Sequence, residues 1–525
     1  MSDQPMKIDA DQTLADWLAV HSATRPEAVA LVTADAQINY AQLSQKVAAL
    51  ASGLAGLGIG KGDVVGIQLP NLAEYVISFL AVTSRGGIVQ TLHMPYRRKE
   101  LRGLLADASA KAIIVTNAEK DSRAEDVMSV RGDLPDLDHI IVVGPAPEGC
   151  VALHSLMETG SDPLEVVEVN TQDEYLLLYT SGTTADPKGV PHVYRSFLNN
   201  AQMSARQLQI DADSRILSLA PMTHLYGLFT MHLAFASGAT LVLLPAFNPK
   251  ALLDDLKSAR ASHIFAAPAH FAPFVAQGML EPDHFRDTKV LCLSGAAVPQ
   301  VLARTVDDIL ENGVVIQLWG MSELQAGTFG RPGDPAEKRF ATAGAAVPRT
   351  EIRITGDGGE VLGAGQEGAL EVRGPSVFAG YLNRPEENAK AFKDDGWFAT
   401  GDLAVIDEDG FMMITGRLKE IINRGGIKYN PVEVEEIITG LPAIQQCAIV
   451  PIPDPDLGER GCLCVQLSPG AEISLEDVTT ALSAIGMSKT KWPEKLVVLE
   501  ELPLTPTRKI MRGTLVKMLQ NHKDR

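Results

Sequence analysis

The chain has 525 residues, of which 46% are hydrophobic and 21% charged, as in an ordinary globular protein. A chain of this length is too long for one hydrophobic core and should divide into at least two domains. The formal net charge of −19 argues against a nucleic-acid binder, which needs a basic surface, and against docking on anionic membranes.

The start of the chain and its cysteines indicate a compartment. Residues 1–11 are polar and acidic, which predicts no signal peptide, and the apolar stretches are too short for a membrane span. The cysteines are scattered and lack metal-ligand spacing, so we expect free thiols in a reducing cytoplasm. They are Cys150, Cys292, Cys447, Cys462 and Cys464.

Predicted strands and helices alternate through the first 150 residues. A short helix over 13–20 precedes strands over 28–33 and 37–40, and helical spacing follows over 41–57. Such alternation continues from the strand 64–69 onward and implies βαβ units with a largely parallel sheet. We expect this segment to be scaffold without chemistry. The apolar stripe of the 41–57 helix consists of Leu43, Val47, Leu50 and Leu54.

A loop rich in small hydroxyl residues follows the apolar run 175–179, which predicts a buried strand. Residues 180–189 are Thr-Ser-Gly-Thr-Thr-Ala-Asp-Pro-Lys-Gly, and the backbone N–H groups of such a loop can surround an anion. Lys188 adds a positive charge. The loop differs from the Walker pattern because Pro187 replaces a glycine and Gly189 follows the lysine. It suits a polyphosphate, although a surface linker has similar composition.

The middle of the chain continues with helices and buried strands. We expect a helix over 192–208, and a strand over 216–219 that ends at the segment 221–227. Further strands are predicted over 239–244, 263–267, 290–294 and 314–318. The last two end at Ser294-Gly295-Ala296-Ala297 and at Trp319-Gly320-Met321-Ser322-Glu323. Small residues at Gly295–Ala297 suit either a planar ring lying on the backbone or tight helix–strand packing.

The last quarter changes character near Lys419. Thr400-Gly401-Asp402-Leu403 and Gly416-Arg417-Leu418-Lys419-Glu420 precede a smaller α+β domain of about a hundred residues. That domain contains Arg424-Gly425-Gly426-Ile427-Lys428, an acidic helix over Pro431–Thr439, and Leu502-Pro503-Leu504-Thr505-Pro506-Thr507-Arg508-Lys509-Ile510.

In this order, the motifs resemble those of the adenylate-forming superfamily, which includes acyl-CoA synthetases, peptide-synthetase adenylation domains and luciferases. The resemblance covers essentially the whole chain. It implies an α/β fold with a large N-terminal domain of parallel-type sheets and helices, residues 1–418. A small α+β C-terminal domain, residues 419–525, would move on a hinge. The implied reaction forms an acyl-adenylate from a carboxylic acid and ATP, and a thiol then displaces AMP.

The resemblance also implies roles for individual residues. Lys509 would neutralise charge between the carboxylate and the α-phosphate, and Glu323 would bind Mg²⁺, which prefers oxygen ligands. Trp319 would stack on adenine, Asp402 would accept the ribose hydroxyls, and Arg417 would complete the ribose and phosphate contacts. The other ATP contacts would be Thr180, Ser181, Gly182, Thr183, Thr184, Lys188, Gly295, Ala296, Ala297, Gly320, Met321 and Ser322. The acyl pocket would include His224 as a gate with Leu225, Gly227 and Gly320; Lys419 would be the hinge, and Gly425, Gly426 and Ile427 would line a CoA tunnel.

Three residues depart from the superfamily pattern. Trp319 and Ser322 replace the usual tyrosine and threonine but keep the aromatic face and the hydroxyl. Arg508 replaces the glycine that usually precedes the catalytic lysine, and the flanking residues fix the register of Lys509.

Leu225 indicates the class of acid. Amino-acid-activating relatives carry an Asp near the position of His224, and hydroxybenzoate-activating relatives often carry an Asn there, whereas Leu225 offers neither group. The runs 331–337 and 423–426 resemble the aryl-adenylating and cyclohexanecarboxylate-CoA ligase branch. We therefore expect a CoA ligase for an apolar ring acid or a short-to-medium aliphatic acid, acting as a monomer or homodimer. A ligase that loads a carrier protein is the first alternative, and a catalytically silent binding protein is the second.

Overall fold

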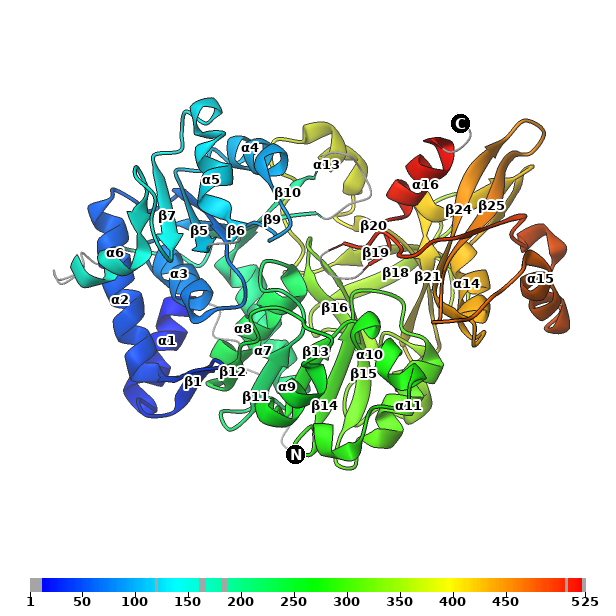
Figure 1. Cartoon of the computed structure of the whole chain (residues 1–525), viewed down its shortest axis with the longest axis horizontal. Coiled ribbons are helices and arrows are strands. Elements are labelled where there is room, and N and C mark those ends of the chain that lie inside the picture. Colours follow the sequence, from blue (N-terminus) through cyan, green and yellow to red (C-terminus); the bar gives the residue numbers. More distant parts are fainter. Residues whose placement is uncertain (1–11, 119–120, 160–166, 181–186, 506–508, 522–525) are drawn as a thin grey trace.

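The computed structural model describes residues 12–118, 121–159, 167–180, 187–505 and 509–521. Within these residues the strands form four β-sheets: two large sheets and an antiparallel one in a large N-terminal domain, and one in a smaller C-terminal domain (Figure 1). The α/β fold class expected from the sequence is confirmed.

The first large sheet has, among the described residues, nine strands in the order β17-β16-β15-β14-β13-β11-β12-β1-β2. The strands from β15 to β1 pair in parallel, and the strands at the two edges pair antiparallel. The strands are β1 (Val29–Val32), β2 (Gln37–Asn39), β11 (Arg215–Ser218), β12 (Thr240–Val242), β13 (His263–Ala266), β14 (Val290–Ser294), β15 (Val314–Met321), β16 (Gln325–Phe329) and β17 (Ala345–Ala346).

The second large sheet follows the order β10-β9-β4-β3-β5-β7-β8 in the described part of the chain, with β6 paired to β5. Its pairs are parallel except β9 with β10 and β5 with β6. The strands are β3 (Val64–Gln68), β4 (Ile88–Thr91), β5 (Ala112–Ala118), β6 (Asp121–Ser122), β7 (His139–Val143), β8 (Val151–Ala152), β9 (Glu174–Tyr179) and β10 (Gly189–Val193).

Helices cover these sheets because each has one apolar face to bury. The predicted stripe of α2 is buried in a hydrophobic cluster that also takes in α3, α7 and α8 and residues of both large sheets. The helices of this region are α1 (Leu14–Thr24), α2 (Tyr40–Gly56), α3 (Ala73–Ser84), α4 (Arg98–Asp107), α5 (Arg123–Met128), α6 (Leu153–Thr159), α7 (Tyr194–Gln207), α8 (Leu225–Ser237), α9 (Leu252–Ala259), α10 (Pro268–Ala276), α11 (Gln300–Ile309), α12 (Ala336–Ala341) and α13 (Pro385–Ala391).

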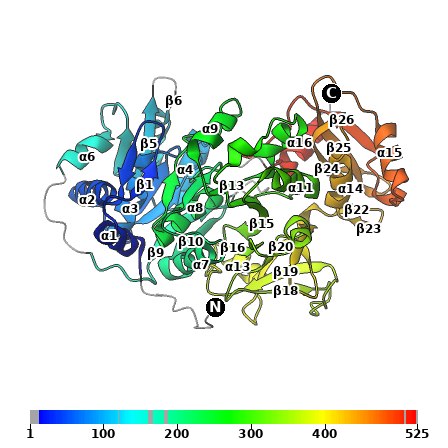
Figure 2. The ribbon, with the colours of Figure 1, turned by 90° about the horizontal axis from the view of Figure 1, so that it is seen from below.

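Two smaller sheets lie toward the C-terminus (Figure 2). The antiparallel sheet β18-β19-β20-β21 carries Asp402 and Arg417 on its last two strands. The C-terminal sheet, in the order β23-β22-β25-β24 with β26 beside β25, is flanked by α14, α15 and α16. The bounds are β18 (Glu351–Thr355), β19 (Gly368–Arg373), β20 (Phe398–Ile406), β21 (Met412–Arg417), β22 (Ile422–Arg424), β23 (Ile427–Tyr429), β24 (Ile444–Asp454), β25 (Gly458–Leu467), β26 (Lys495–Val498), α14 (Pro431–Thr439), α15 (Leu475–Ala484) and α16 (Arg512–Asn521).

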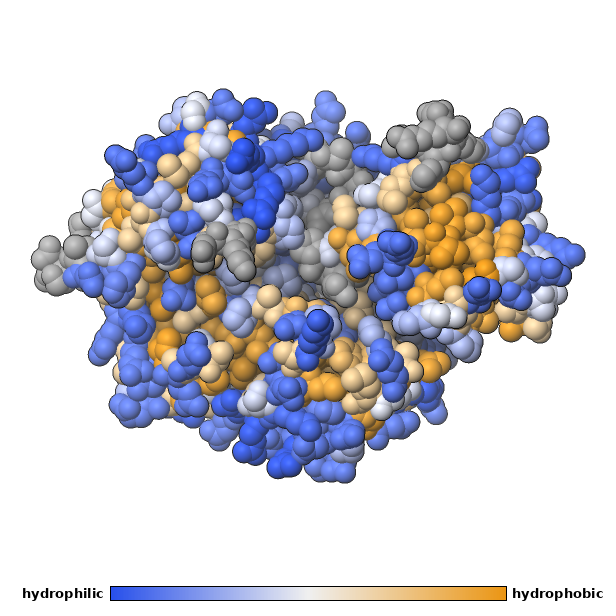
Figure 3. Space-filling view, viewed as in Figure 1, coloured by the Kyte–Doolittle hydropathy of each residue, from blue (hydrophilic) through white to orange (hydrophobic). Residues whose placement is uncertain are grey.

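Apolar residues gather on one face of the C-terminal domain, beside α16 (Figure 3). The cluster beneath that helix joins β24 and β25 to the segment before Lys509, and its members include Val450, Cys462 and Leu515. The five cysteines are free thiols, four of them buried, as the sequence predicted.

The expected helix over 192–208 is wrong at its start. His192 and Val193 belong to β10, which pairs antiparallel with β9, and α7 begins only at Tyr194. Pro191 cannot donate a backbone hydrogen bond, and a proline in a sequence argues against a strand. The sequence pattern therefore did not predict β10. The pairing with β9 decides the structure here.

Candidate active site

The predicted phosphate loop leaves the end of β9 and returns at the start of β10. The backbone N–H of Thr180 donates to the carbonyl of Lys188 at 3.0 Å, and the Lys188 N–H donates to Thr180 Oγ1 at 3.2 Å. The two ends of the loop are therefore closed by direct pairing. Ser181, Gly182, Thr183 and Thr184 lie outside the described residues.

Lys188 and Glu323 face each other across Tyr381. The Lys188 ammonium lies 3.9 Å from the centre of the Tyr381 ring, and the Tyr381 hydroxyl donates to Glu323 Oε1 at 2.9 Å. Burial raises the pKa of Glu323, while the Tyr381 hydrogen bond and the charge of Lys188 oppose the rise. The sequence reading did not single out Tyr381, because a tyrosine in a loop carries no local signature of such a contact.

Trp319, Asp402 and Arg417 form a connected group. The indole Nε1–H of Trp319 donates to Asp402 Oδ2 at 2.9 Å, and Arg417 Nε lies 3.0 Å from Asp402 Oδ1. Asp402 and Arg417 are register partners in β20 and β21. A Cβ on Gly327 would collide with the Trp319 ring, so the indole packs directly on this backbone. The Asp402 carboxylate therefore lies between two donors.

Lys509 extends from the C-terminal domain into this group. Its Cε lies 3.9 Å from the Cβ position of Gly295, at the end of β14. Burial lowers the pKa of Lys509 to about 8, and the charge of Arg417 adds to the lowering, while Asp402 and Glu323 oppose it. The predicted lysine, ribose and metal-binding residues therefore lie together, although 186 positions separate Glu323 from Lys509 in the sequence.

His224 lies at the N-cap of α8, and its Nδ1 accepts the backbone N–H of Tyr226 at 3.2 Å. Burial lowers the pKa of His224 well below its usual value, and the nearby charges of Lys509 and His93 add to the effect. The imidazole is therefore neutral. Since Nδ1 is an acceptor, the proton is on Nε2.

The first 150 residues hold the loop that carries His224. Asn71 Nδ2 donates to the carbonyl of Ala220 at 3.2 Å, and Tyr75 donates to the carbonyl of Met222 at 2.7 Å. His93 stacks on His224 with ring centres 5.9 Å apart, and its Nδ1 lies 3.2 Å from Thr223 Oγ1. The segment expected to be plain scaffold thus orients a predicted site residue. The sequence reading missed these contacts because each joins distant positions.

Two predicted pocket glycines have no free space at their Cβ positions. A Cβ on Gly227 would collide with the carbonyl of Pro221, and one on Gly320 would collide with the carbonyl of Gln325. Leu225 is buried in α8, and Ala296 and Ala297 are exposed after β14. Glycine at 227 and 320 is required by close backbone packing, in addition to any role beside a ligand.

Gly425 and Gly426 form the tight turn between β22 and β23. Both have positive φ angles, +60° and +88°, which glycine adopts without strain. Arg424 and Ile427 are register partners across the turn, and Ile427 is exposed. Lys419 lies in the short 3-10 helix Leu418–Glu420, between β21 and β22. These residues lie on the hairpin at the edge of the C-terminal sheet and on its connection to the N-terminal domain.

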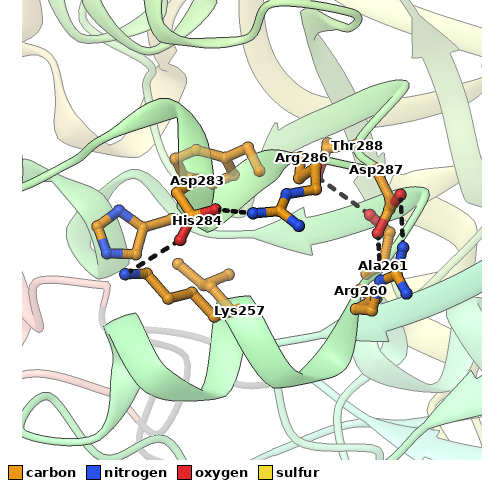
Figure 4. A pocket seen from close by; sticks show the side chains of 10 residues that line it. Lys257, Arg260, Ala261, Asp283, His284, Arg286, Asp287 and Thr288 are labelled. Atoms are coloured by element: carbon orange, nitrogen blue, oxygen red, sulfur yellow. Dashed lines mark hydrogen bonds and ion pairs between the residues drawn. The ribbon is translucent and has the colours of Figure 1, made fainter.

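A separate hollow of about 180 Å³ lies between α9 and the 3-10 helix Pro282–Phe285 (Figure 4). Its three cations are all paired with carboxylates: Lys257 and Arg286 with Asp283, and Arg260 with Asp287. The charges of this hollow therefore satisfy one another.

Family comparison decides between these sites. Residues 18–382 match the AMP-binding enzyme family, and residues 433–509 match the AMP-binding enzyme C-terminal domain. The chain belongs to the AMP-binding enzymes. Both matches include parts of the Lys509 site, which is therefore the candidate active site of this family member.

Relatives span nearly the full length of this AMP-binding enzyme. A salicylyl-CoA synthase / salicylate adenylyltransferase from a Streptomyces species is 32% identical over 97% of this chain and 94% of the relative. A medium-chain fatty-acid–CoA ligase from Escherichia coli (strain K12) is 31% identical, covering 97% and 90%. The crystal structure of an anthranilate CoA ligase with anthranoyl-AMP superposes with a TM-score of 0.90 at 26% identity, covering 100% of both chains.

Two further observations on the described residues of this AMP-binding enzyme concern metal sites and membrane spans. Within the described ranges, no group of three or more His, Cys, Asp or Glu side chains is arranged to hold a metal ion. Helices that combine the length and apolar character of a membrane span are absent from the part of the chain that the structure describes.

Proposed function

We propose that the protein is an ATP-dependent acid–CoA ligase that forms an acyl-adenylate and then an acyl-CoA thioester. The observation that carries the proposal is the position of Lys509. It lies against Gly295, the charges of Asp402 and Glu323 act on it, and its own charge acts on His224. The relatives named above support the same reaction class.

In the first step, the carboxylate oxygen attacks the α-phosphorus of ATP and pyrophosphate leaves. Such a transfer needs positioning and charge neutralisation more than a protein nucleophile. The Lys509 ammonium stabilises the charge that develops between carboxylate and phosphate. Lys188 and the loop from Thr180 hold the outer phosphates, while Asp402 and Arg417 hold the ribose.

The buried Glu323 carboxylate fits a role in binding Mg²⁺, which usually takes one or two carboxylates together with substrate phosphates. Mg²⁺ would neutralise phosphate charge there. The neutral His224 adds no positive charge that would compete with Lys509 for the carboxylate, and its Nε2–H is a hydrogen-bond donor at the acid end of the pocket.

In the second step, the thiol sulfur of CoA attacks the acyl carbon and AMP leaves. We propose that residues 419–525 form a mobile domain that turns about Lys419 after the first step. This turn would withdraw Lys509 and bring Gly425, Gly426 and Ile427 to the active site, where their hairpin would line the CoA tunnel. Glycine at this turn allows a thin ligand to approach the backbone closely.

We propose an apolar ring acid or a short-to-medium aliphatic acid as the substrate. Leu225, next to His224, supplies neither a carboxylate nor an amide to bind a polar substituent. The names of the relatives include ring acids and a medium-chain acid. Salicylate and anthranilate each carry a polar ring substituent, and the absence of a polar side chain at Leu225 is what favours an unsubstituted ring here. We also propose a cytoplasmic location, which suits five free cysteines, and a monomer or homodimer.

A panel of acids tests the substrate class. Acid-dependent exchange of pyrophosphate into ATP would be measured with benzoate, cyclohexanecarboxylate, hydroxybenzoates and straight-chain acids from acetate upward. We expect the unsubstituted ring acids or medium chains to give the highest kcat/KM. Preference for a hydroxybenzoate or an amino acid would contradict the proposed pocket.

A further inference from the structure

Asn430 lies at the boundary between the two domains, as the N-cap of α14. Its Oδ1 accepts the backbone N–H of Val432 at 3.1 Å, which caps the helix. Its Nδ2 donates in the other direction, to the backbone carbonyl of Thr415 in β21. One side chain therefore caps a helix of the C-terminal domain and bonds the last strand of the N-terminal domain. Figure 1 shows α14 beside β21.

The backbone of β21 is shaped to receive this amide. A Cβ on Gly416 would collide with the Asn430 amide, so only glycine leaves the space that the side chain fills. Asn430 is itself buried. The contact lies next to Arg417, which is bonded to Asp402.

A second set of contacts connects Asn430 to the catalytic lysine. Glu435, one turn further along α14, makes two hydrogen bonds of 2.6 Å with the guanidinium of Arg512. Arg512 begins α16, three residues after Lys509, and its Nε also lies 3.1 Å from Glu420 in the hinge segment. These contacts connect β21 to α14 and α14 to Arg512, which is three residues from Lys509 in the sequence.

We propose that Asn430 is a positioning residue for adenylate formation: its amide latches the C-terminal domain to β21 in the arrangement that brings Lys509 into the active site. The inference rests on the proposed function. Any turn of the C-terminal domain about Lys419 separates Asn430 from Thr415, because the two residues lie on opposite sides of the hinge. The latch therefore favours the first half-reaction and opposes the second.

Asn430→Asp removes the hydrogen bond to Thr415 and keeps the cap of α14, so it separates the effects of the two contacts. Aspartate caps a helix as well as asparagine does, but it has no N–H to donate and places a carboxylate against the Thr415 carbonyl. Asn430→Ser is the second variant, since its short hydroxyl caps α14 without reaching β21. Ser474→Ala is the matched control, because Ser474 caps α15 in the same domain by accepting the Asp477 N–H at 3.1 Å.

The two half-reactions would be measured separately. We expect both Asn430 variants to lower acid-dependent pyrophosphate exchange by about three- to tenfold, the range of one net hydrogen bond. Thioester formation from supplied acyl-adenylate and CoA should be unchanged or faster. Ser474→Ala should lower the Tm and leave both rates unchanged. An equal fall in both half-reactions, or unchanged exchange, would overturn the proposal.

Limited trypsin digestion supplies a readout that needs no turnover. Lys419, the proposed hinge, and Arg417 at the end of β21 are both exposed. We expect cleavage at these two residues to be faster in both Asn430 variants than in the wild type at equal Tm. Unchanged cleavage would also overturn the latch. If the wild-type protein showed no pyrophosphate exchange with any of the acids tested, the proposed function would fail. The digestion would still test the latch in that case.

Discussion

Lys509 is the residue proposed to neutralise the charge that develops in the adenylation step. Lys509→Ala removes the ammonium near Asp402 and Glu323, and we expect pyrophosphate exchange to fall by about a hundredfold or more, as when a preorganised charge donor is lost. Lys517→Ala, on the exposed face of α16, is the control and should leave exchange unchanged. A loss of less than threefold in Lys509→Ala would contradict its assignment.

The lowered pKa of Lys509 predicts a pH dependence. The side chain is an ammonium below its pKa of about 8 and neutral above it. We expect kcat/KM for adenylation, which reports on the free enzyme, to fall as the pH rises through about 8. Thioester formation from supplied acyl-adenylate should not show this fall, because the proposed domain turn withdraws Lys509 from the site. A flat adenylation profile between pH 7 and pH 9 would speak against the charged form as the active one.

Trp319 connects the predicted adenine and ribose contacts through one hydrogen bond. Trp319→Phe keeps an aromatic face but removes the Nε1–H that holds Asp402. A hydrogen bond to a charged group contributes about 1.5 kcal/mol or more, so we expect the KM for ATP to rise by about tenfold. The change should appear in KM more than in kcat. An unchanged KM would show that Asp402 is positioned without the indole.

At the scale of single elements, the close packing of the hairpin between β15 and β16 requires glycine at position 320. Gly320→Ala would force a Cβ into the Gln325 carbonyl, and we expect the free energy of unfolding to fall by about 1–3 kcal/mol, as for other overpacked sites. Thermal unfolding measures the change. Gly333→Ala is the matched control, since its Cβ meets nothing within 4 Å. Equal Tm values for the two variants would contradict the packing argument.

Elements with strong local patterns were predictable from the sequence. The strand over 290–294 is β14 with the same bounds, and the stripe of α2 is buried as expected. The strand β10 was missed because its five residues include Pro191, and its partner β9 lies across a loop. The pairing with β9 makes residues 189–193 a strand, and a short stretch of sequence does not show which distant strand will pair with it.

At the scale of the whole molecule, the sequence predicted most residues of the candidate site but not the residues that contact and orient them. The motifs named Lys509, Asp402, Arg417 and Glu323, and the fold brings them together. Tyr381 and His93 were not predicted, because each acts through a contact with a residue more than fifty positions away. Contacts between the domains, such as that of Asn430 with Thr415, likewise cannot be predicted from a local sequence pattern.

The two domains of this one chain are proposed to carry out adenylate formation and then thioester formation. The direct measurement is mass-spectrometric detection of acyl-CoA, with AMP quantified in parallel, after incubation with ATP, Mg²⁺, CoA and the preferred acid. We predict acyl-CoA and AMP in equal amounts, each dependent on both acid and CoA. Acid-dependent pyrophosphate exchange without any acyl-CoA would contradict the claim and identify a ligase that loads a different thiol, such as that of a carrier protein.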